Sequence, residues 1–72
     1  MSIFMYADGY VRIKIWGGSV ERFMVLCSHK RMLLWNIEAH GEYTFVNMRL
    51  RDFYNCRKMA RKAGVRAVVV ER

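Results

Sequence analysis

"YVRIKIWGGSVERFMVLC", residues 10–27, decides the fold, because its hydrophobic period changes at a pair of glycines. Residues 10–16 alternate apolar with polar or aromatic side chains, which is the period of a strand with one buried face. Gly17-Gly18 ends this strand, and Ser19 is a suitable N-cap. Residues 20–31 then predict a helix with these apolar side chains on one face: Val20, Phe23, Met24, Leu26 and Cys27.

The rest of the chain repeats this alternation of strands and helices. Residues 32–39 and 43–50 predict two strands, joined by the short His-Gly-Glu connection. Residues 51–64 predict a second helix that ends at Gly64. Its buried face is expected to hold Phe53, Cys56, Met59, Ala60 and Ala63. The β-branched run at 65–71 predicts the last strand.

This order of elements, βαββαβ, identifies the fold class. Two right-handed β-α-β crossovers joined by a hairpin form the split βαβ, or ferredoxin-like, fold. We therefore predict an α+β protein: a four-stranded antiparallel sheet, in the order 4-1-3-2, with two helices on one face. Residues 1–9 are expected to form a short N-terminal tail, and residues 10–72 a single domain.

The strand periods also assign the two faces of the sheet. The face under the helices is expected to hold Val11, Ile13, Ile15, Leu33, Trp35, Ile37, Val46, Met48, Val65, Ala67 and Val69. The open face is expected to hold Tyr10, Arg12, Lys14, Trp16, Leu34, Asn36, Tyr43, Phe45, Asn47, Arg66, Val68 and Val70. Because an exposed antiparallel face is ordinarily polar, this mixture of aromatic, aliphatic and cationic side chains is typical of a contact surface.

The charge of the chain points to an acidic partner. Lys and Arg number 13 against 6 Asp and Glu, which gives a net charge of +7. The cations concentrate on the second predicted helix, where two i, i+4 pairs form a candidate basic patch: Arg57, Lys58, Arg61 and Lys62. An anionic membrane attracts such a patch by about 1 kcal/mol per cation. A merely solvated helix face is the alternative interpretation of the same pattern.

Single-stranded RNA is an alternative partner for the open face. Tyr43 and Phe45 occupy third-strand positions at which RNA-recognition domains stack bases. The first strand offers Arg12 where such a domain has an aromatic residue, with Lys14 two positions on. These four side chains form the candidate contact face, and the missing aromatic makes nucleic acid less favoured than a protein partner.

Metal binding and catalysis find little support in the sequence. The candidate ligands Cys27, His29, His40 and Cys56 form no zinc-binding motif, and both cysteines fall on buried helix faces. The acidic residues are scattered, and the glycine pair is not a phosphate-binding loop. We therefore predict no catalytic residue, metal, cofactor or small-molecule substrate. Two cysteines cannot form a disulfide framework, which indicates a reducing compartment.

Four segments together resemble a known family: "GYVRIKIWGGSVERFMVLC", "LLWNI", "LRDF" and "RKAGVRAVVVER". Over residues 9–72 they resemble the N-terminal segment of the YqfD-type stage IV sporulation proteins of endospore-forming Firmicutes. The resemblance implies a small N-terminal domain followed by a transmembrane segment and a larger extracytoplasmic region, and it implies no catalytic residues. The family's Gly-Ile-Pro turn is replaced here by residues 30–33, and the family continues beyond the position of Arg72.

Composition and resemblance together predict a non-enzymatic sporulation domain that acts by contact. The expected partners are another protein, a second copy bound through the sheet face, or an anionic membrane surface. The expected location is the cytoplasm, next to the membrane where the full protein carries the family's transmembrane segment. The alternative is a module that binds single-stranded RNA through the open face.

Overall fold

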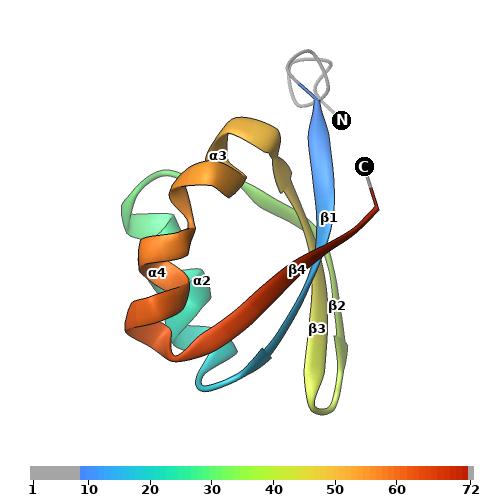
Figure 1. The fold of residues 1–72 in the computed structure, drawn as a ribbon, viewed down its shortest axis with the longest axis vertical. Coiled ribbons are helices and arrows are strands. Elements are labelled where there is room, and N and C mark those ends of the chain that lie inside the picture. Colours follow the sequence, from blue (N-terminus) through green and yellow to red (C-terminus); the bar gives the residue numbers. More distant parts are fainter. Residues whose placement is uncertain (1–8, 72) are drawn as a thin grey trace.

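The computed structural model describes residues 9–71, apart from the side chain of Glu71, as a sheet with helices on one face (Figure 1). Along the chain the elements are β1 (Tyr10–Gly17), α2 (Val20–His29), β2 (Leu34–His40), β3 (Tyr43–Arg49), α3 (Leu50–Asn55), α4 (Arg57–Ala63) and β4 (Val65–Glu71). All paired strands are antiparallel, and their order is β2-β3-β1-β4. This is the predicted order read from the other edge, so the α+β, ferredoxin-like fold class is confirmed. The predicted tail lies outside the described residues except for Gly9.

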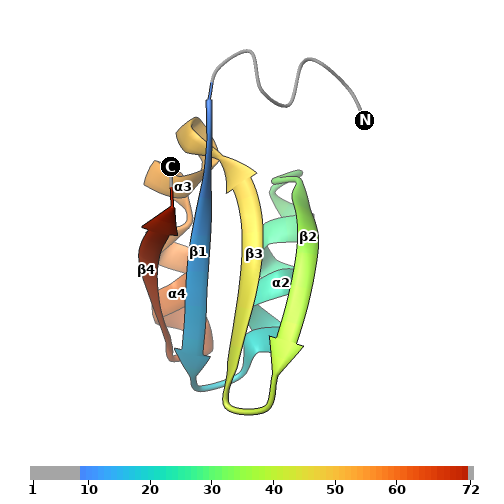
Figure 2. The ribbon, with the colours of Figure 1, turned by 90° about the vertical axis from the view of Figure 1, so that its right-hand side faces the viewer.

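The hydrophobic core lies between the sheet and the helices, which stand behind the sheet in Figure 2. Strand β1 is central, and its Val11, Ile13 and Ile15 are almost completely buried, as their alternation predicts. Helix α2 covers them with Phe23 and Cys27. The remaining buried apolar side chains come from β3, α4 and their neighbours: Val46, Met48, Cys56, Met59, Ala63 and Val65.

The loop between β1 and α2 is fixed to the end of α4. The Ser19 hydroxyl accepts a hydrogen bond from the Arg22 amide at 3.1 Å, which confirms the predicted N-cap. The Ser19 amide in turn donates to the Ala63 carbonyl at 3.0 Å. Gly64 ends α4 in the left-handed conformation, as predicted, and lies beside Gly18.

The prediction of one continuous helix over 51–64 is wrong, because the chain turns at Cys56. The Cys56 amide donates to the Phe53 carbonyl, three residues back, at 3.3 Å. This tight turn separates α3 from α4 and leaves the Cys56 side chain in the core. Neither glycine nor proline marks the turn in the sequence.

The face assignment of the second strand is also wrong at its beginning. Arg31 takes a left-handed conformation after α2, with φ of 58°, and the strand begins at Leu34 instead of at position 32. Leu34 pairs with the buried Met48 and packs against the core, whereas Trp35 pairs with Asn47 and faces the open side. The pattern of apolar residues gave the reverse assignment.

A β-bulge restores the predicted orientation later in the same strand. The pairing with β3 shifts between Trp35 and Glu38, and Asn36 has a positive φ of 55°. Beyond the bulge, Glu38 and His40 lie opposite open-face residues of β3. The hairpin itself contains only Gly41 and Glu42, so His40, which was expected in the turn, belongs to β2.

Candidate functional site

The open face of the sheet is turned towards the viewer in Figure 2, and the strand registers fix where its side chains lie. The strand registers place them in three rows, each running from β2 towards β4: His40, Tyr43, Trp16, Arg66; then Glu38, Phe45, Lys14, Val68; then Trp35, Asn47, Arg12. All four predicted contact residues are therefore on this face, on the neighbouring strands β1 and β3.

Arg12 is the centre of a hydrogen-bonded network on this face. Its guanidinium donates to the Asn47 side-chain oxygen at 2.7 Å, to the Asn36 carbonyl at 3.0 Å and to Glu38 Oε1 at 2.6 Å. The other carboxylate oxygen of Glu38 lies 3.2 Å from His40 Nε2. Because these partners hold the guanidinium and its side chain is only 14% exposed, Arg12 organises the face instead of reaching out from it.

The aromatic residues of β3 form a cluster with His40. The Tyr43 and Phe45 rings lie 5.4 Å apart at 73°, in an edge-to-face arrangement. The His40 ring stacks on Tyr43 at 5.4 Å and 24°, and it meets Phe45 edge-on at 5.6 Å. The rings therefore support one another, and Tyr43 is not an isolated stacking platform.

Cations from β1 complete the cluster from the other side. Lys14 Nζ lies 4.7 Å from the centre of the Tyr43 ring and 5.7 Å from that of Trp16. The guanidinium carbon of Arg12 lies 5.3 Å from the centre of the Phe45 ring. Such cation–π contacts stabilise by about 0.5–1 kcal/mol each at exposed sites. The face is thus a preassembled surface that carries both aromatic rings and charged groups.

Sequence reasoning missed three members of this face: Trp35, Glu38 and His40. Trp35 was placed on the opposite face, and His40 was placed in the turn. Glu38 was not named in the candidate contact face. Their contacts depend on the bulge at Asn36, and an asparagine within an apolar strand was the signal for it, since asparagine tolerates positive φ.

The predicted basic patch lies on the opposite layer of the molecule, on α4. Arg57, Lys58, Arg61 and Lys62 are all exposed, and none of the acidic side chains that the structure describes pairs with any of them. The patch faces away from the sheet, because α4 packs on the core through Met59 and Ala63. Its charge is therefore directed at solvent or at a partner.

A groove beside the patch adds a fifth cation. Lys30, at the end of α2, lines this groove of about 470 Å³ together with Arg57, Lys58 and Arg61 of α4. Tyr54, 65% exposed, lies at the same groove. Sequence reasoning missed Lys30 here, because only the packing of α2 against α4 brings the ends of the two helices together. The groove is concave, cationic and amphipathic, which suits an anionic surface.

The two cysteines are free thiols inside the core. Burial, together with smaller effects of the nearby Cys56 and Asp52, raises the pKa of Cys27 to about 12. Burial also raises the pKa of Cys56, to about 11, against the opposing effect of Arg57. In the described part of the chain, no group of three or more His, Cys, Asp or Glu side chains could hold a metal ion.

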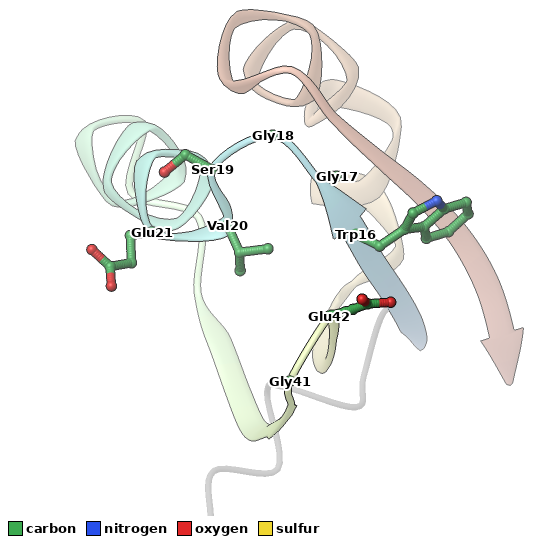
Figure 3. A pocket seen from close by; sticks show the side chains of 8 residues that line it. All are labelled: Trp16, Gly17, Gly18, Ser19, Val20, Glu21, Gly41 and Glu42. Carbon is green, nitrogen blue, oxygen red and sulfur yellow. The ribbon is translucent and has the colours of Figure 1, made fainter.

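A hollow of about 710 Å³ lies between the β1–α2 loop and the β2–β3 hairpin (Figure 3). Its two carboxylates, Glu21 and Glu42, point in different directions, and Glu42 lies on the side of Trp16. Glycine backbone forms much of the remaining wall. The two carboxylates therefore do not converge on one point of the hollow.

Comparison with known proteins agrees with the resemblance seen in the sequence. None of the helices within residues 9–71 is both long and apolar enough to cross a membrane. No curated protein and no solved structure matches the chain. A family model described as "Putative stage IV sporulation protein YqfD" matches residues 5–72, which is nearly the whole chain. The chain therefore belongs to the YqfD family.

Proposed function

We propose that this domain, which its family relates to sporulation, acts without catalysis by holding its basic helical layer against an anionic membrane surface. The observation that carries the proposal is the state of the cations on α4. Arg57, Lys58, Arg61 and Lys62 are exposed without acidic partners in the described structure, whereas Arg12 on the sheet is bound by Glu38. The unpaired cations keep their full charge for a partner.

The magnitude of the attraction is sufficient for weak, reversible binding. Each cation near an anionic surface contributes about 1 kcal/mol, so the four patch cations together supply about 4 kcal/mol. Lys30 adds to this from the neighbouring groove, and Tyr54 offers an amphipathic ring of the kind found at membrane interfaces. A cytoplasmic position beside the membrane, which the family resemblance implies, would bring this face to its partner.

A vesicle flotation assay tests the proposal. The protein should float with vesicles that contain roughly 40% phosphatidylglycerol, whose anionic headgroups give a strong negative surface potential. It should not float with vesicles of pure phosphatidylcholine. Replacing Lys58→Gln and Lys62→Gln together should remove about 2 kcal/mol, which is about a 30-fold loss of affinity. Equal binding to both kinds of vesicle would refute the proposal.

The matched control removes the same charge from the other face. Lys14→Gln with Arg66→Gln lowers the net charge by the same amount but acts on the sheet. This variant should keep most of the vesicle affinity, because binding depends on where the charge lies. If both double variants lose the same affinity, net charge alone governs binding and the helical face is not the site.

Single-stranded RNA remains the alternative partner, and the geometry of the open face makes specific demands on it. A base that stacks on Tyr43 must compete with the His40 ring and the Lys14 ammonium already in contact with it. Titration of fluorescent RNA at two salt concentrations tests this alternative. Binding that is lost in both Tyr43→Ala and Phe45→Ala would favour RNA over the membrane.

A further inference from the structure

The open face of the sheet is complementary to itself across its midline. The midline runs between the two central strands, β3 and β1. Strand β2 lies at the edge next to β3, and β4 lies at the edge next to β1. We propose that two copies of this chain pair through their open faces, related by a two-fold axis parallel to the strands. This pairing uses the layer opposite the basic patch, so it is independent of the proposed membrane contact.

The central strands supply the aromatic part of the complementarity. A two-fold axis along the midline places β3 of each copy over β1 of the other copy, so this contact occurs twice in the dimer. Tyr43 then faces Trp16 of the second copy, and Phe45 faces Lys14, because each pair already shares a row. Aromatic pairs and cation–π contacts are favourable in this geometry, and two sheets pack about 10 Å apart with nearly aligned strands.

The outer strands supply the charges. The same axis places β2, which carries Glu38, over β4, which carries Arg66 of the second copy. These residues belong to adjacent rows, about 7 Å apart along the strands, a distance that an arginine side chain spans. Arg66 is exposed, and it lies on the open face because Ala67 beside it packs on the core. Glu38 is bound to Arg12 of its own chain, but its side chain is 52% exposed, so it can also accept from Arg66 of the other copy.

Much of the net charge of +7 lies away from the paired faces, although Lys14 and Arg66 of each copy add cations to the interface itself. The four patch cations lie on α4, behind the sheet, so the pairing directs them outwards on opposite sides of the dimer. Charges farther apart than a Debye length, about 8 Å at physiological salt, are largely screened. A second copy fits better than a wholly acidic or wholly apolar partner, because the face carries both charges and aromatic rings.

Two charge reversals and their mixture provide the test. In an Arg66→Glu homodimer, Glu38 of each copy would face the new glutamate of the other copy. In a Glu38→Lys homodimer, Arg66 of each copy would face the new lysine of the other copy. We expect each variant alone to dimerise roughly 100-fold more weakly than the wild type, because like charges facing each other across an interface are strongly unfavourable. Mixed in equal amounts, the two variants should form a 1:1 heterodimer, because both contacts then join opposite charges. Sedimentation equilibrium and native mass spectrometry report these species.

Arg61→Glu is the control, since it reverses a cation on the helical layer and should leave the dimer affinity unchanged. Far-UV circular dichroism checks the fold of each variant. Glu38→Lys also removes a partner of Arg12. If the Glu38→Lys variant unfolds, the dimer affinities of Arg66→Glu and Arg61→Glu are compared instead, and this comparison is sufficient to test the proposal. The proposal would be overturned by a wild-type chain that stays monomeric at millimolar concentration. Equal dimer affinities of Arg66→Glu and Arg61→Glu would also overturn it.

Discussion

Substituting Gly18 by alanine tests the contact that fixes the β1–α2 loop to the end of α4. A Cβ atom at this position would collide with the Ala63 carbonyl oxygen and with the backbone of Gly64. The backbone also has a positive φ of 34°, which strains any residue with a side chain. Overpacking costs about 1–3 kcal/mol and the left-handed conformation about 1–2 kcal/mol, so the free energy of unfolding should fall by about 2–5 kcal/mol.

This loss is large for a chain of 72 residues, whose expected stability is roughly 4–11 kcal/mol. Urea unfolding followed by the fluorescence of Trp16 and Trp35 measures it. Gly41→Ala is the matched control, because Gly41 also has a positive φ, 67°, but no atom within 4 Å of the added methyl group. It should lose only about 1–2 kcal/mol. If the Gly18 variant loses no more than this control, the close approach of the loop to α4 is not important for stability.

Three further predictions concern other parts of the molecule. Arg31→Gly should raise the unfolding free energy by about 1 kcal/mol, because Arg31 has a φ of 58°; an unchanged or lower melting temperature would contradict this. The thiols of Cys27 and Cys56, with pKa raised to about 12 and about 11, should react with iodoacetamide at pH 8 at least ~100-fold more slowly in the folded chain than in urea. If paired copies present their basic patches on opposite sides, the wild-type protein should cluster anionic vesicles, which turbidity measures. The Arg66→Glu variant should bind these vesicles without clustering them.

Alternation and capping residues were sufficient to predict most of the fold. The period of β1, the glycine pair and the Ser19 cap act locally, and they assigned the first strand and helix almost to their ends. Gly64 ended α4 at the predicted place because a left-handed residue is required there. The turn at Cys56 was not predictable in the same way. It depends on how α3 and α4 each pack on the core, and no residue type marks it.

The second strand shows why part of the site could not be predicted. Its apolar residues fit either face, and the choice depends on where the preceding helix ends. The left-handed Arg31 and the bulge at Asn36 make that choice. A shift of one residue exchanges the two faces of a strand, so Trp35 and Leu34 were interchanged. Tyr43 and Phe45 were placed on the open face, because β3 is regular from its turn onwards.

The structure divides the charge of the chain into two functional kinds, which composition alone cannot separate. Arg12 contributes as much to the net charge as Arg61 does, yet Arg12 is bound by Glu38, Asn47 and a backbone carbonyl. Replacing Arg12 would leave the buried Asn47 oxygen without its donor, so its loss should be seen first as lost stability. Replacing Arg61 removes no hydrogen bond or ion pair within the described fold, so its loss should be seen first in binding. A partner that senses total charge would not distinguish these two arginines, and a partner that docks on α4 would.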